Sequence, residues 1–179
     1  MAITEATQKW VESVVIELNL CPFAKRELIN HRVRFYATEA TLPEQLLGCL
    51  QGELERLEYD ASIETTLLIH PDVLQDFAAY NQFLDLADAL LIDLNLEGIF
   101  QIASFHPDYQ FAGSEADDVE NYTNRSPYPM LHLIREQSLA RALENYPDAE
   151  NIPKRNIELL NKLGLKKMQE LLQRTYLVD

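Results

Sequence analysis

The sequence predicts an α/β fold, with a small, mainly parallel sheet of three or four strands that is flanked by helices and extended by further helices at both ends of the chain. Two observations predict it. Short apolar segments with the alternation of strands are separated by segments with helical spacing, which is the order of parallel strands joined by crossover helices. No hairpin turn signal lies between the expected strands, which disfavours antiparallel neighbours.

The first part of the chain predicts two helices and a strand. Helical spacing is found at Val11, Val14, Val15 and Leu18. Pro22 ends this helix, because proline disfavours the helical conformation at the residue before it. Pro22 also suits the first turn of a short helix over about 22–30, with Cys21 as its N-cap. A strand follows at about 32–38, where apolar and polar side chains alternate.

The middle of the chain predicts two further pairs of one helix and one strand. A helix begins at Pro43 and ends near Tyr59, and a strand covers 63–69. A helical region then covers about 71–94, and a strand covers 99–105. These lengths are typical of strands and helices in a globular protein.

The last part of the chain predicts a long loop and then helices only. Residues 107–128 show no clear periodicity. A helix is expected from Pro129 to about Asn145, because proline favours the first helical turn. Another begins at Pro153 and is interrupted at Gly164.

Length and composition favour one globular domain over residues 1–179. The chain is 47% hydrophobic, which excludes an intrinsically disordered protein. The net charge of -14 disfavours nucleic acid and anionic membranes as partners. Residues 39–120 hold 18 acidic side chains and a single base, Arg56. The simplest interpretation of this stretch is a solvated acidic surface. It also leaves positive charge only near the two ends of the chain, where an anionic ligand would have to bind.

We expect a cytoplasmic protein without a cofactor. No signal peptide and no apolar run of ~18 residues is evident, and Cys21 and Cys49 do not form a disulfide framework. The sequence contains no phosphate-binding loop, no dinucleotide fingerprint and no nucleophile elbow. The composition sets no oligomeric state.

The end of the long loop is a candidate anion site. Amides, hydroxyls and one guanidinium stand directly before the helix expected at Pro129, and a helix N-terminus favours carboxylate or phosphate groups. The candidate ligands of the anion are Asn121, Asn124, Arg125, Ser126 and, farther along, Arg135. The alternative is ordinary capping, since Asn, Thr and Ser commonly precede helices.

Histidines are the candidate general acids and bases. His70 and His106 each begin a His-Pro-Asp tripeptide after an expected strand, so parallel strands would place both at one sheet edge. His132 lies on the expected helix after Pro129, either facing a cleft or pairing with Glu136 at the surface. His106 and His132 are retained as catalytic candidates.

Cys21 is a candidate nucleophile. An N-cap position and nearby Lys25 and Arg26 would favour its thiolate. The alternative is a buried structural cysteine, because Leu20 and Phe23 flank it. Cys21, His106 and His132 would make a chemically reasonable zinc set, but no pair has close ligand spacing, so no metal site is predicted.

Several of these segments together resemble a bacterial family known as domain of unknown function 1415. They are Leu20–Ala24, Phe105–Pro107 and Asn121–Pro129, then His132, Leu133 and Arg135, and finally Ile152-Pro153 and Arg155-Asn156. The resemblance covers nearly the whole chain and implies a bacterial cytoplasmic protein, without implying an activity.

Two functions remain open from the sequence. The first is an enzyme acting on a small anionic metabolite, with a carboxylate or phosphate bound by arginines, a histidine as acid or base, and Cys21 as a possible nucleophile. The second is a non-catalytic module that binds a small ligand, or serves in an interaction, through the same pocket. The two differ in geometry, because catalysis requires a histidine within hydrogen-bond reach of Cys21 or of the ligand.

Overall fold

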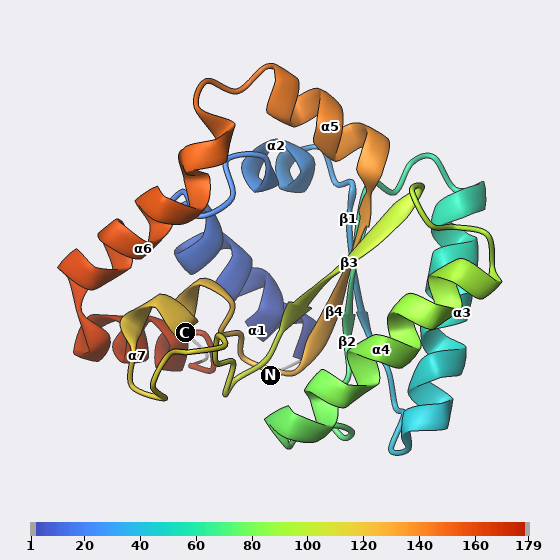
Figure 1. Cartoon of the computed structure of the whole chain (residues 1–179), viewed down its shortest axis with the longest axis horizontal. Helices are drawn as coiled ribbons and strands as arrows, with labels where there is room; N and C mark the ends of the chain where they lie inside the picture. The colour runs from blue at the N-terminus through green and yellow to red at the C-terminus, as the bar shows by residue number, and fades with distance from the viewer. Residues whose placement is uncertain (1–2, 178–179) are drawn as a thin grey trace.

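The computed structural model describes residues 3–177 and shows a mixed α/β fold built on one four-stranded sheet (Figure 1). The strands are β1 (Val33–Ala37), β2 (Thr65–Ile69), β3 (Phe100–Phe105) and β4 (Met130–Arg135). Their order in the sheet is β1-β2-β4-β3. β1 and β2 are parallel, whereas β4 is antiparallel to both β2 and β3. The expectation of a mainly parallel sheet is therefore wrong.

The strand β4 accounts for this error. The first three strands run in one direction, as the sequence predicts, because a helix connects each to the next: α3 (Pro43–Tyr59) and α4 (Phe77–Asp93). The connection from β3 to β4 contains no crossover helix that would carry the chain back across the sheet. The chain therefore re-enters the sheet from the edge at which it left, and β4 runs opposite to its neighbours.

The helix expected from Pro129 is also wrong in its first half. Residues 130–135 form β4, and only α5 (Glu136–Glu144) is helical. The other predicted helices agree better with the structure. Near the C-terminus, α6 (Ile152–Leu163) and α7 (Leu165–Arg174) are separated at Gly164, whose φ of 81° favours glycine.

Helices cover both faces of the sheet (Figure 1). α3 and α4 lie on one face, over side chains such as Leu68, Leu131 and Leu133. The other face is covered by the N-terminal helix α1 (Ile3–Trp10), its continuation as a π-helical segment η1 (Val11–Ile16), and the C-terminal helices. Each face has its own hydrophobic cluster, as the alternation along the strands requires.

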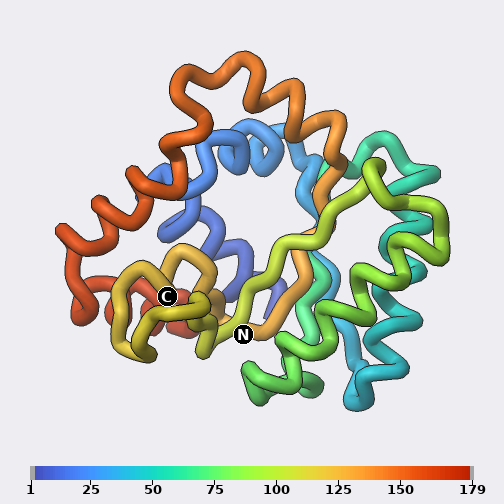
Figure 2. The backbone as a smooth tube through the Cα atoms, viewed as in Figure 1, coloured from blue at the N-terminus to red at the C-terminus, as the bar shows by residue number. Residues whose placement is uncertain are grey.

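The backbone path brings the two ends of the chain into one layer. Figure 2 shows α5, in orange, reaching the short helix α2 (Ala24–Ile29) at the top of the view. The contact between these regions includes an edge-to-face pair of Phe23 with Tyr146, with ring centroids 5.6 Å apart. None of the helices in residues 3–177 has the length and apolar character needed to traverse a bilayer.

Candidate functional site

A cavity of about 310 Å³ lies between the sheet and the N-terminal layer. We call it the sheet cavity. All four strands contribute to its floor or walls, and η1, α2 and α5 complete them. Its lining residues are Trp10, Val11, Val15, Cys21, Phe23, Ala24, Glu27, Val33, Glu64, Thr65, Leu67, Ala103, Phe105, His132, Ile134, Ser138, Leu139 and Ala142. Most of these side chains are apolar, so the cavity suits an apolar molecule.

His132 lines the sheet cavity from β4, one of the two inner strands of the sheet. It lies on β4 between Leu67 of β2 and Ala103 of β3 in the strand register. The small Ala103 leaves space beside the imidazole. Burial lowers the pKa of His132 to about 4, so the ring is neutral at physiological pH. Its expected position on a helix is wrong, and the strand is what directs it into the domain.

Cys21 also lines the sheet cavity. The expectation that it is a helix N-cap is wrong, because α2 begins at Ala24 with Phe23 as its N-cap. Burial raises the pKa of the Cys21 thiol, outweighing the backbone N–H groups of Phe23 and Ala24 that favour its thiolate. No hydrogen bond joins the Cys21 thiol to the His132 ring within residues 3–177. The two side chains thus share a cavity without forming a nucleophile–base pair.

The segment that carries Cys21 is held by α6. The Asn156 side-chain amide donates a hydrogen bond of 2.8 Å to the Leu20 carbonyl, and the Arg155 guanidinium donates one of 2.9 Å to the Asn19 carbonyl. Asn19 has a φ of 52°, a left-handed conformation that asparagine tolerates better than most residues. Through these contacts Arg155 and Asn156, although far along the sequence, fix the backbone of the segment that carries Cys21.

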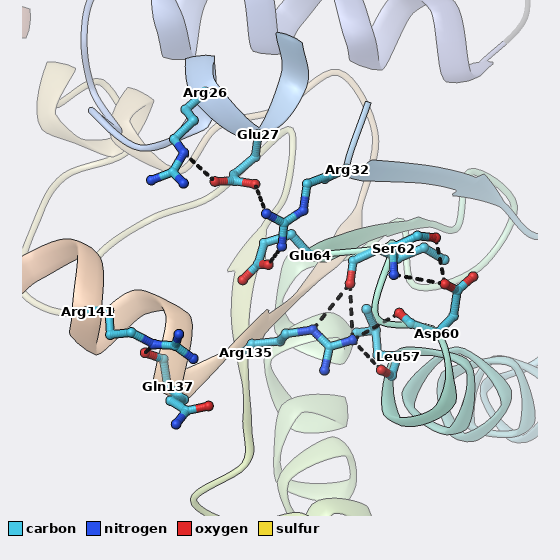
Figure 3. A network of polar contacts seen from close by, with 11 residues as sticks. Arg26, Glu27, Arg32, Leu57, Asp60, Ser62, Glu64, Arg135, Gln137 and Arg141 are labelled. Atoms are coloured by element: carbon cyan, nitrogen blue, oxygen red, sulfur yellow. Dashed lines mark hydrogen bonds and ion pairs between the residues drawn. The ribbon is translucent and has the colours of Figure 1, made fainter. Parts of the chain in front are cut away.

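Two carboxylates form the charged part of the cavity lining. Glu27 of α2 and Glu64, just before β2, both lie against the Arg32 guanidinium (Figure 3). The distance from Arg32 Nη1 to Glu27 Oε2 is 3.5 Å, and Arg32 Nη2 donates a hydrogen bond to Glu64 Oε2. Glu27 Oε1 also lies 3.7 Å from Nε of the exposed Arg26, so each carboxylate has an arginine partner (Figure 3). Within the described chain, no arginine or lysine is part of the cavity lining.

His106 lies outside the sheet cavity. It follows β3 at the sheet edge, next to His70 after β2, as the common direction of these strands predicts. Both histidines are fully buried against Tyr80. His106 Nε2–H donates to the Leu74 carbonyl at 3.2 Å, and its Nδ1 accepts from the Asp108 N–H at 3.0 Å. With both nitrogens bonded to backbone groups, His106 connects the loop after β2 with the loop after β3 and does not line the sheet cavity.

The candidate anion ligands hold the long loop instead. The Asn121 side chain is buried and bonded to the backbone of Phe111 and Glu115, and Asn124 donates to the Ser104 carbonyl. The Ser126 hydroxyl donates to the Tyr128 carbonyl at 2.7 Å. No helix begins at Pro129, so the helix N-terminus on which the anion site depended does not exist.

The two arginines of the expected anion site are likewise bonded to backbone. Arg125 Nε donates to the Tyr109 carbonyl at 3.1 Å and Nη2 to the Ala116 carbonyl at 2.7 Å. Arg135 donates to the Leu57, Asp60 and Ile63 carbonyls, which lie at the end of α3 and in the connection to β2 (Figure 3). Neither side chain lines the sheet cavity. Of the sequence candidates, the structure brings together only Cys21 and His132.

Sequence reasoning missed Thr65, Trp10 and the two carboxylates of the cavity. A signal existed for Thr65, because it alternates with Leu67 and Ile69 and so shares their face of β2. No such signal existed for Trp10, because its position on a predicted helix does not indicate which residues it packs against. Within residues 3–177, no group of three or more His, Cys, Asp or Glu side chains is arranged to hold a metal ion.

The chain matches the model of a known family. The model of the family described as a protein of unknown function, DUF1415, matches residues 2–170. The chain therefore belongs to this family. No curated protein and no solved structure matches it.

Proposed function

We propose that the protein binds a small, predominantly apolar ligand in the sheet cavity. One observation carries the proposal: a cavity of about 310 Å³ opens onto the middle of the sheet. A space of this size beside the core is uncommon, because protein interiors are close-packed. Its volume falls within the range of small-molecule sites. The π-helical segment η1, which supplies Val11 and Val15 to the wall, is a rare conformation that is frequent at functional sites.

The paired charges of the wall favour a neutral ligand. The sequence predicts an anion held by Arg125 and Arg135, but both guanidinium groups are bonded to backbone carbonyls elsewhere. The charged side chains of the lining are Glu27 and Glu64. An anion would lie against these carboxylates, and the neighbouring arginines, Arg26 and Arg32, are already paired with them.

Catalysis is the second candidate function, and the shared position of Cys21 and His132 favours it. In that case His132 would be the acid or base and Cys21 the nucleophile. The raised pKa of the Cys21 thiol weighs against this, because the thiolate is the nucleophile. Binding without a covalent step is therefore the function that we favour.

Trp10 provides the test, since it is the single tryptophan of the chain and lines the sheet cavity. We expect iodobenzene, a neutral heavy-atom quencher, to reduce Trp10 fluorescence in a saturable manner. Ala142→Leu should fill part of the cavity and weaken this quenching. Ala140→Leu is the matched control, because Ala140 lies on the same helix α5 but is exposed.

The outcomes separate a bound probe from collisional quenching. Saturation in the wild type and in Ala140→Leu, with loss in Ala142→Leu, supports the proposal. Quenching that rises linearly with iodobenzene concentration and is equal in all three proteins refutes it.

A further inference from the structure

The hydrogen bonds of Thr65 determine which nitrogen of His132 carries the proton. The Thr65 hydroxyl oxygen lies 2.6 Å from the Leu133 carbonyl oxygen and 2.7 Å from His132 Nε2. Two oxygens at 2.6 Å require a proton between them, and the carbonyl has none, so the Thr65 hydroxyl donates to Leu133. The same hydroxyl must then accept from His132, which places the imidazole proton on Nε2.

This leaves His132 Nδ1 as a lone-pair acceptor. Within residues 3–177, Nδ1 has no hydrogen-bond partner, and it is not among the polar atoms that are both buried and unpartnered. The atom therefore retains accessible surface. Because His132 lies deep in the domain and lines the sheet cavity, that surface faces the cavity. The neighbours of the ring across the strands, Leu67 and Ala103, carry no polar group to satisfy it.

We infer that the ligand of the sheet cavity presents a neutral hydrogen-bond donor, such as a phenolic or alcoholic O–H or an N–H, to Nδ1 of His132. This inference rests on the proposed function and specifies its ligand class. An apolar body would fill the walls, while the single donor would orient it on the floor. A carboxylate or carbonyl in the same place would set its lone pairs against that of Nδ1.

Two probes of nearly equal shape provide the test. Phenol carries the donor, and fluorobenzene replaces it with fluorine, a poor acceptor that donates nothing. Each is used to displace iodobenzene from the cavity, with Trp10 fluorescence as the readout. We expect phenol to bind about tenfold more tightly than fluorobenzene, the effect of one hydrogen bond inside the cavity.

Variants assign this preference to one nitrogen. His132→Phe should remove the preference for phenol and retain fluorobenzene binding. Thr65→Val should reduce the preference, because the ring is then free to take the other tautomer. Thr66→Val is the matched control, since Thr66 is the next residue of β2, faces the opposite side of the sheet, and has a buried hydroxyl without a partner. It should keep the preference of the wild type.

A second measurement does not depend on the folding of any variant. Nitrogen NMR of the wild-type imidazole distinguishes a protonated from a bare Nδ1, and we expect His132 to show a bare Nδ1. A protonated Nδ1, or equal binding of phenol and fluorobenzene, would overturn the inference while leaving the proposed function intact. Failure of iodobenzene to bind at all would overturn the proposed function itself.

Discussion

Replacing Arg125 by lysine distinguishes an arginine that supports the loop from one that binds an anion. Arg125 reaches the carbonyls of Tyr109 and Ala116 through two different nitrogens and lies over the Tyr122 ring at 4.7 Å. These contacts join the two sides of the long loop between β3 and β4. A lysine retains the charge, but its single ammonium group cannot reproduce the fork that serves both carbonyls.

The expected loss follows from these contacts. A hydrogen bond from a charged donor contributes about 1.5–3 kcal/mol, and the partial exposure of Arg125 favours the lower end of this range. If lysine keeps one of the two bonds, the free energy of unfolding falls by about 2 kcal/mol. For a chain of this size, that corresponds to a decrease in Tm of roughly 4–8 °C.

Thermal unfolding without sulfate measures the loss of stability, and thermal unfolding with sulfate measures whether an anion binds. Arg141→Lys is the control, because Arg141 is exposed on α5 and makes a single bond of 3.4 Å to the Gln137 carbonyl (Figure 3). Its Tm should change little. The reasoning is refuted if Arg125→Lys keeps the Tm of the wild type and abolishes a stabilisation by sulfate that the wild type shows.

Two further predictions concern groups whose pKa is shifted by burial. His70 and His132 have pKa values lowered to about 4, whereas the unfolded chain binds their protons near the ordinary 6.5. The unfolded state therefore holds more protons between these values, so stability should decrease as the pH falls from about 6.5 toward 4. Urea midpoints that stay constant between pH 6.5 and 5 would contradict this. In a Cys49→Ser background, Cys21 should react slowly with iodoacetamide at pH 7 and faster at alkaline pH, because burial raises the pKa of its thiol. Rapid reaction at pH 7, as for an activated thiolate, would favour the catalytic alternative.

The elements with a clear period could be predicted from the sequence, and β4 could not. The alternation in β1 and the leucine spacing in α3 identify those elements within one or two residues. Residues 130–134 form a short, nearly continuous apolar run, which is compatible with a buried strand or a buried helix. Pro129 does not separate the two, since proline is accepted at the start of either element.

The candidate site was predictable only in part, because its chemistry depends on which polar groups the backbone leaves unsatisfied. His132 and Cys21 are recognisable as unusual residues in the sequence. Arg125, Asn121 and His106 look equally suited to a site, yet each is bonded to loop carbonyls or N–H groups. Pairing of this kind follows from the path of the long loop, and residue types alone do not reveal it.

The position of β4 constrains the order in which the molecule can be assembled. β1 and β2 are adjacent, so a nascent chain can pair them as soon as both are available. β3 is separated from β2 by the place that β4 will occupy, a gap of about two strand spacings, or roughly 9.5 Å. Until residues 130–135 leave the ribosome, β3 has no neighbouring strand to pair with in this sheet, and the floor of the cavity lacks His132. The sheet cavity and the closed sheet therefore arise in one late event of synthesis, and an incomplete chain would expose a strand edge rather than a complete cavity.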